Sequence, residues 1–200
     1  MTTTKLYFDD QEGEGPSREN SHPNFVKVLT DEFYYDCTDE FSPFGNDDGA
    51  DILFNLEDCY KENGKLSKPV KFVKDYIDET LGFETKHIKL TDKTKILKIN
   101  SEEEFMFDSI DHAIIATAFG QYKIEGTLNS DLKDLANIAL ERQKIITQNQ
   151  IDNNEIELRK LVKIVDGQTT RPDEQGGMND TFQMYLDRLN KMKDDLQLLI

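Results

Sequence analysis

The apolar residues of this chain recur mostly at intervals of three and four, which is the spacing of amphipathic helices. Capping residues or a proline precede most of these stripes, and a glycine follows several of them. The stripe that begins after Asp47 and Asp48, for example, ends at Asn63-Gly64. The predicted helices are residues 23–29, 47–63, 69–81, 101–125, 130–150, 153–166 and 179–200.

Two segments depart from the amphipathic pattern. The helix that is expected to start with a capping box, Ser101 to Glu104, becomes apolar on every side from Ala113 to Phe119. This predicts a central helix that is buried all round. Residues 86–100 instead alternate apolar and polar side chains around a Thr-Asp-Lys turn, which is typical of a small β-hairpin.

These patterns predict a mainly α protein, a single compact helical domain of about six or seven helices with one small β-hairpin near residues 86–100. Two hundred residues suffice for one domain with its own core. Residues 1–21 are expected to form a flexible acidic N-terminal segment, because residues 9–21 combine acids, glycines and a proline without an apolar anchor. The domain is expected over residues 22–200, with a polar linker at 167–177 before the C-terminal helix.

The charge of the chain is strongly negative and unevenly distributed. The net charge is −16, and residues 1–64 carry 4 basic and 16 acidic side chains, a net of −12. Such a surface repels nucleic acid and anionic membranes, so direct binding to either is not expected. It attracts basic partner proteins. Solubility alone is the alternative explanation for the acidity.

The sequence carries no sign of export or membrane insertion. The chain does not open on a basic stretch followed by an apolar run, and no apolar run approaches the ~18 residues of a membrane span. We therefore expect a cytoplasmic protein. Cys37 and Cys59 are too far apart for a CxxC motif and too few for a disulfide framework or zinc site, so free thiols are expected.

The segment 33–51, FYYDCTDEFSPFGNDDGAD, places aromatic residues among acids and contains no basic residue. Rings supply rigid contact area and carboxylates pair with Lys or Arg, so this composition favours docking onto a basic protein. The alternative is that the rings anchor the loop to the core while the acids, asparagine and glycines form a turn and a helix cap. The candidate partner-binding residues are Tyr34, Tyr35, Asp36, Asp39, Glu40, Phe41, Phe44, Asp47, Asp48 and Asp51.

A calcium site in the same segment was tested against the EF-hand pattern. Both registers, with the invariant glycine at Gly45 or at Gly49, put Phe44 at a ligand position, so the pattern fails. A different cation site on Asp47, Asp48 and Asp51 is a minor alternative, and we expect no metal and no cofactor.

The sequence offers little for catalysis. It has no nucleophile elbow, P-loop, dinucleotide-binding fingerprint or zinc-protease motif. Asp108 and His112 lie four residues apart on one predicted helix face, which allows either an ordinary helix contact or an oriented general base. An acid/base or metal-dependent hydrolase built on Asp47, Asp51, Asp108 and His112 is therefore the alternative function, and a non-enzymatic one is preferred.

Two passages resemble the YfeS-like family of bacterial proteins. The first is FSPFGNDDGAD, with Phe41, Pro43, Phe44, Gly45, Asn46, Asp47, Gly49 and Asp51 at the matching positions. The second is AFGQYK, with Ala118, Phe119, Gly120, Gln121 and Lys123. The resemblance covers about residues 22–126 and implies a mainly helical bacterial domain in which these two segments lie together. Some relatives are associated with a domain named for a Trp-Gly-Arg motif. This chain has no tryptophan, so that association does not carry over.

The function that the sequence favours is an acidic protein-binding module that neutralises or regulates a basic protein partner. A bacterial immunity protein that blocks a toxin such as a nuclease is the specific form of this hypothesis, by analogy with other small acidic bacterial proteins. The apolar stripe of the last helix runs to the final residue and suits either the protein's own core or another chain, so the oligomeric state stays open.

Overall fold

The structure is a computed structural model that describes residues 5–9, 15–164 and 173–200, with side chains throughout except at 155–164 and 173–178. The described residues contain helices and no strand. The α-helices are α1 (Pro23–Val28), α2 (Asp47–Asn63), α3 (Pro69–Asp75), α4 (Lys93–Glu102), α5 (Met106–Glu125), α6 (Ser130–Ile164) and α7 (Asp173–Leu198). Shorter turns occupy η1 (Glu32–Tyr35), η2 (Tyr76–Thr80) and η3 (Thr85–His87).

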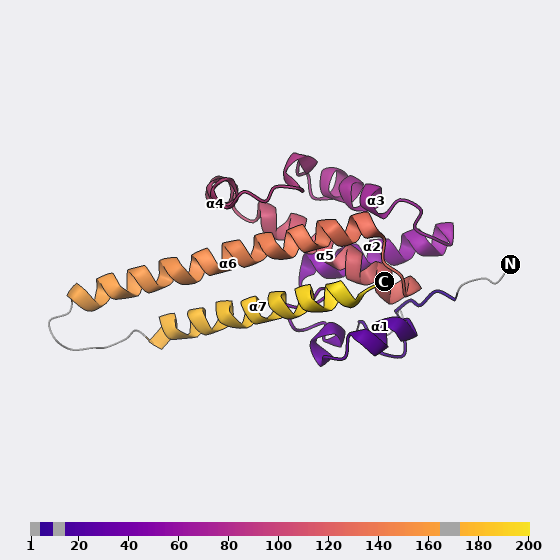
Figure 1. Ribbon diagram of the computed structural model, residues 1–200, viewed down its shortest axis with the longest axis horizontal. Helices are drawn as coiled ribbons and strands as arrows, with labels where there is room; N and C mark the ends of the chain where they lie inside the picture. The colour runs from indigo at the N-terminus through magenta and orange to yellow at the C-terminus, as the bar shows by residue number, and fades with distance from the viewer. Residues whose placement is uncertain (1–4, 10–14, 165–172) are drawn as a thin grey trace.

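Helix α5 is the centre of the fold, as its sequence predicts. Every side chain from Ala113 to Ile124 is buried, and α5 packs against α1, α2, α3 and α6. Helices α6 and α7 run antiparallel and side by side, and their far ends extend beyond the rest of the body (Figure 1). None of the helices in the described part combines the length and hydrophobicity that crossing a membrane requires.

The predicted β-hairpin near residues 86–100 is wrong. This segment forms η3 and the start of α4 instead. The Thr-Asp-Lys sequence that suggested a turn is a helix N-terminus, because the Oδ1 of Asp92 accepts a hydrogen bond from the backbone N–H of Lys95 at 2.9 Å. Ile96 is buried and Ile99 packs on the core, three residues apart on one helix face. The apparent alternation was part of a helical stripe.

Other helix boundaries also differ from the predicted ones. Ser101 lies inside α4, and the chain turns at Phe105, whose φ of 64° is left-handed, so α5 begins at Met106. The two helices predicted over 130–166 are one continuous helix, because the polar run between them contains no glycine or proline to break it. Of the predicted linker, residues 173–177 belong to α7 and residues 167–172 lie outside the described residues.

The described parts of the N-terminal segment pack on the body. Lys123 of α5 is fully buried, and its Nζ lies 2.8 Å from Asp9 and 3.3 Å from Glu57 of α2. The backbone N–H of Tyr7 donates to the carbonyl of Ile124 at 3.2 Å. Residues 5–9 are therefore held against α2 and α5 by a buried ammonium group.

The two segments that carry the family resemblance lie together. A Cβ on Gly120 would stand 2.8 Å from a methyl carbon of Leu56, 3.2 Å from one of Leu53 and 3.9 Å from the ring of Phe44. A side chain at this position would displace these leucine side chains, so glycine suits the close approach of α5 to α2 and the preceding loop. The resemblance predicted this juxtaposition.

Candidate functional site

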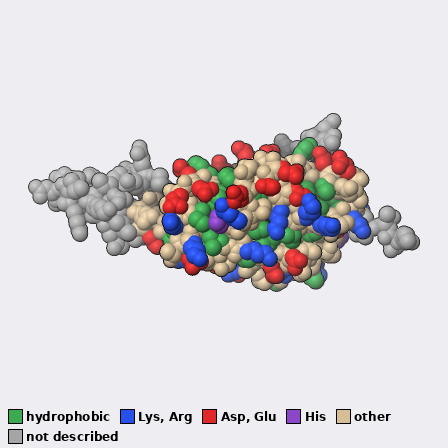
Figure 2. All heavy atoms as spheres, turned by 90° about the horizontal axis from the view of Figure 1, so that it is seen from above, with side chains coloured by type: hydrophobic (Ala, Val, Ile, Leu, Met, Phe, Trp, Pro, Cys, Tyr) green, Lys and Arg blue, Asp and Glu red, His purple; other side chains and the backbone are tan. Residues whose placement is uncertain are grey.

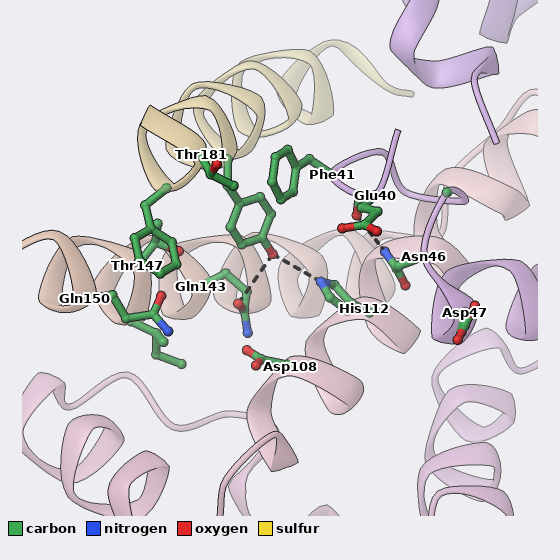
Figure 3. Close-up of a pocket in the computed structure, with 14 residues that line it drawn as sticks. Glu40, Phe41, Asn46, Asp47, Asp108, His112, Gln143, Thr147, Gln150 and Thr181 are labelled. Carbon is green, nitrogen blue, oxygen red and sulfur yellow. Dashed lines mark hydrogen bonds between the residues drawn. The ribbon is translucent and has the colours of Figure 1, made fainter. Parts of the chain in front are cut away.

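An open cavity of about 390 Å³ lies where the loop before α2 meets α5, α6 and α7 (Figure 3). This volume is at the lower end of the range for small-ligand pockets. Four segments that are far apart in sequence converge on it. The lining residues are Glu40, Phe41, Gly45, Asn46, Asp47, Asp108, His112, Gln143, Ile146, Thr147, Gln150, Thr181, Phe182 and Tyr185.

The loop wall of the cavity is shaped by its own polar side chains. Asp39 accepts a hydrogen bond from the backbone N–H of Phe41 at 3.0 Å, and Asn46 donates to the carbonyl of Glu40 at 3.4 Å. The Oδ1 of Asn46 also caps α2 by accepting from the N–H of Gly49 at 2.8 Å. Asn46, rather than the neighbouring aspartates, is thus the cap, and these bonds place Glu40 and Phe41 at the cavity.

Tyr185 of α7 stands at the centre of the site. Its ring stacks on Phe41 with centroids 4.9 Å apart. Its hydroxyl lies 3.1 Å from Nε2 of His112 and donates to Oε1 of Gln143 at 3.4 Å (Figure 3). Burial raises the pKa of Tyr185, so the hydroxyl keeps its proton at neutral pH.

Asp108 and His112 project from successive turns of α5 into the same cavity. Burial lowers the pKa of His112, while the charges of Asp108 and Asp48 oppose that change. Burial raises the pKa of Asp108, and His112 opposes that rise. At pH 7 His112 is therefore a neutral imidazole, and its hydrogen-bond partner is Tyr185. The sequence predicted the shared face of Asp108 and His112, but it did not predict Tyr185.

Beneath the cavity lies a buried ion pair that the sequence reading missed. Nε of Arg142 donates to both carboxylate oxygens of Asp111, at 3.1 and 3.0 Å, and Nη1 donates to the carbonyls of His87 and Leu90 at 3.0 and 3.2 Å. Gln143 donates to Asp111 at 2.9 Å and accepts from Tyr185. Burial raises the pKa of Asp111, and the charge of Arg142 opposes the rise.

A signal for this pair is visible in the sequence. Arg142 and Gln143 interrupt the apolar stripe between Leu140 and Ile146, and Asp111 is the last acid before the apolar part of α5. A charged residue among buried positions needs a partner of opposite charge, so these positions predict a buried pair.

The structure divides the ten predicted partner-binding residues into two groups. Glu40, Phe41 and Asp47 line the cavity, and Asp48 and Asp51 lie in the first turns of α2 nearby. The other five serve the fold: Tyr34 and Phe44 are buried in the core, Tyr35 donates to the carbonyl of Leu29, Asp36 bonds Thr38, and Asp39 pairs with Arg188. The rings therefore mostly anchor the loop, which was the alternative explanation of this segment.

The residues proposed for a hydrolase converge only in part. Asp47, Asp108 and His112 line the one cavity, whereas Asp51 does not. In the described part of the chain, no three His, Cys, Asp or Glu side chains are grouped so that they could hold a metal ion. Cys37 and Cys59 are free thiols. The arrangement can accept a cation, exchange hydrogen bonds through neutral His112 and Tyr185, and cover an apolar group with Phe41 and Phe182.

The chain is similar to a bacterial protein over most of its length. The chain is 32% identical over 175 residues to "Uncharacterized protein YfeS" of Escherichia coli (strain K12), and the match covers 85% of this chain and 69% of that protein. No protein-family model matches the chain, and no solved structure matches it. At this identity and coverage, and with both motif segments in contact in the fold, the chain belongs to the YfeS family.

Proposed function

We propose that this protein is an acidic binding module that docks onto a basic protein partner, and that the cavity beside α2 receives a basic side chain of that partner. One observation carries the proposal. Glu40, Asp47 and Asp108 line one open cavity, and within the described part of the chain no Lys or Arg forms an ion pair with any of them. A cation supplied by a partner could pair with these carboxylates.

The surrounding acids behave differently. Asp39 pairs with Arg188 at 3.1 Å, and Asp31 pairs with Lys191 at 2.9 Å. Asp39 and Asp31 already have an internal cation, so they gain less from an external one than Glu40, Asp47 and Asp108 do, and burial shields Asp108 from water. This difference supports the cavity, rather than the whole acidic surface, as the anchor of the interface.

The charge distribution supports the same orientation. Residues 65–98 hold nine lysines and five acids, so the face that carries α3 and α4 shows lysines among carboxylates (Figure 2). The excess negative charge therefore lies elsewhere, chiefly in residues 1–64. A basic partner is steered toward the N-terminal third and the cavity at its edge.

The specific partner that we propose is a toxin such as a nuclease, which this protein would block as an immunity protein. A nuclease needs Lys and Arg to hold phosphate, and an acidic module that covers those side chains prevents substrate binding. The bacterial relative is consistent with this setting.

The test measures association with a basic protein encoded beside the gene, by calorimetry at two salt concentrations. The variant Glu40→Gln/Asp47→Asn/Asp108→Asn removes the cavity charges. The variant Glu62→Gln/Asp78→Asn/Glu104→Gln is its control, because it removes three exposed acids away from the cavity. Tight association that weakens with salt and with the first variant only is expected. Association that is insensitive to salt and to the first variant, or the absence of any basic partner, would contradict the proposal.

A second function is favoured by one observation, the convergence of Asp47, Asp108 and His112 on one cavity. In this proposal His112 acts as a general base in a hydrolase, with its orientation fixed by the hydroxyl of Tyr185. The test is a panel of ester and phosphoester substrates. Hydrolysis that His112→Gln abolishes and Tyr185→Phe reduces would support the hydrolase, and no turnover of any substrate in the panel would count against it.

A further inference from the structure

We propose that the cavity binds a guanidinium group, so that the side chain it takes from a partner is arginine rather than lysine. This inference rests on the proposed function, because it specifies the basic group that enters the same cavity. It is carried by the way this fold treats its own arginines, by the chemistry of the cavity wall and by one buried hydroxyl.

Each arginine whose side chain is described sits on an aromatic ring and pairs with a carboxylate. Arg18 lies 4.2 Å from the ring centroid of Tyr35 and 2.7 Å from Glu32. Arg142 lies 4.6 Å from the ring of Phe107 and pairs with Asp111. Arg188 lies 4.4 Å from the ring of Phe33 and 3.1 Å from Asp39. In all three cases the guanidinium therefore contacts both an aromatic ring and a carboxylate.

The cavity presents that combination a fourth time. The ring of Phe41 stacks on that of Tyr185, and the carboxylates of Asp108 and Glu40 line the same cavity. Among the residues whose side chains the structure describes, no lysine or arginine lines the cavity. Arg188, one turn after Tyr185 on α7, is turned to Phe33 and Asp39 instead. A guanidinium from outside is the group that matches what the wall offers.

Thr147 of α6 is an independent observation that points to a ligand. Its side chain is 99% buried, at 1% exposure, and it lines the cavity. None of the hydrogen bonds among the described residues involves its hydroxyl, and this oxygen is not one of the fully enclosed side-chain atoms that lack a partner. A planar group with several N–H donors can reach this oxygen and a carboxylate at once.

The choice between arginine and lysine follows from donor geometry. A guanidinium is flat, weakly hydrated and carries five N–H donors, so it suits a cavity whose lining includes the ring of Phe41 and the acceptor oxygens of Asp108, Glu40 and Thr147. An ammonium group is a compact, strongly hydrated charge with three donors, and it gains less from a ring face. The cavity volume of about 390 Å³ accommodates the end of one such side chain.

The experiment uses three small probes with the full chain: the N-acetyl methylamides of arginine, lysine and citrulline. Citrulline is the neutral counterpart of arginine with nearly the same shape. Binding is followed by chemical-shift changes of the His112 ring and of the amides of α6. We expect the arginine probe to bind with a Kd on the order of 1 mM. We expect the lysine probe to bind about tenfold more weakly. No binding is expected for the citrulline probe.

Variants locate the binding. Thr147→Val keeps the shape of the side chain and removes only the hydroxyl, so the affinity for the arginine probe should fall about three- to tenfold, the worth of one hydrogen bond. Asp108→Asn should abolish binding, and Asp194→Asn, an exposed acid on α7, should leave it unchanged. Thermal unfolding of each variant verifies that the fold persists.

Two results would overturn the inference: equal binding of the arginine, lysine and citrulline probes, or no binding of the arginine probe at roughly 10 mM. If a basic protein partner still binds in a cavity-dependent way, the proposed function survives and only the choice of guanidinium fails. If the arginine probe binds at Thr147 and Asp108, the inference stands whether or not a protein partner has been found.

Discussion

Among the side chains that the structure describes, two cations are buried, and their surroundings differ. Lys123 is fully buried between α2 and the N-terminal segment, where Glu57 and Asp9 neutralise it, and none of these three residues lines the cavity of the candidate site. Arg142 is equally buried, but the Gln143 beside it joins the ion pair to Tyr185 and so to the cavity. The comparison teaches that a buried ion pair becomes part of a site through its neighbours rather than through its own charge.

The carboxylates that pair with the two cations also differ in the contacts that they keep when the cation is removed. Glu57 keeps Lys61 at 3.6 Å and the backbone N–H of Asp9 at 2.9 Å, and Asp9 is partly exposed. Asp111 is fully buried, and without Arg142 it would keep only Gln143. An orphaned carboxylate costs more where water cannot reach it. The two centres should therefore differ sharply when each cation is removed.

The largest expected effect is on Arg142. The change Arg142→Met leaves Asp111 buried and nearly unpaired and removes the charge that opposes its raised pKa, so Asp111 must take up a proton or stay charged without a partner, and the free energy of unfolding should fall by about 3–5 kcal/mol. Urea denaturation followed by circular dichroism measures it. The double variant Arg142→Met/Asp111→Leu should recover more than half of that loss, because it removes both charges. A single-variant loss below about 1 kcal/mol would mean that water reaches this centre.

A smaller loss is expected at the other centre. Lys123→Met should lower the free energy of unfolding by about 1–3 kcal/mol, since Glu57 retains other partners. The loosened contact with Asp9 should also speed hydrogen exchange at the amide of Tyr7, which donates to Ile124. Exchange at the amides of α6 serves as the internal control. A loss equal to that of Arg142→Met would break the comparison.

The smallest expected effect is a change in the pKa of one histidine, which distinguishes the region of Arg142 from the region of Lys123. Burial places the pKa of His112 and of His22 below the ordinary 6.5. His22 lies near Lys123, because its backbone N–H donates to the backbone carbonyl of Lys123. Asp108→Asn should lower the pKa of His112 further, because a favourable charge is lost, and should leave His22 unchanged. Histidine ring signals in NMR report both values.

The lowered pKa of His112 also determines the direction in which the stability of the protein changes with pH. A folded-state pKa below 6.5 means that the unfolded chain binds a proton first, so this contribution is complete above pH 6.5 and is lost as the pH falls toward the folded value. His112→Gln should therefore flatten the acid side of the stability profile. An unchanged slope between pH 7 and 5 would show that the folded-state pKa of His112 is not lowered.

The sequence predicts the helices well wherever a stripe has clear ends, as α2 does between Asn46 and Gly64. It fails at residues 86–100 because an aspartate followed by a lysine suits a turn and a helix N-terminus alike, and only Ile96 packing on the core decides between them. It divides α6 wrongly because a polar run resembles a break, although no residue there prevents a helix from continuing.

Individual residues of the candidate site could be predicted from the sequence, but their convergence on one cavity could not. Spacing places Asp108 and His112 on one face, and composition singles out the loop with Glu40 and Phe41. Their meeting with Tyr185 depends on how α7 crosses the loop, and no local pattern contains that information. Of the predicted partner-binding residues, Tyr34 and Phe44 are buried in the core, and Tyr35, Asp36 and Asp39 contact the protein's own residues, because aromatic residues and turn-forming acids also serve as anchors for a loop.

The loop before α2 has a kinetic consequence. A Cβ on Gly45 would stand 2.1 Å from the carbonyl oxygen of Asp39, and Asn46 donates to the carbonyls of both Glu40 and Ser42. The cavity wall is thus preorganised during folding, and an incoming group does not have to order it. Recognition at such a wall proceeds as a rigid encounter, so its rate is governed by the electrostatic approach of the two surfaces rather than by loop closure.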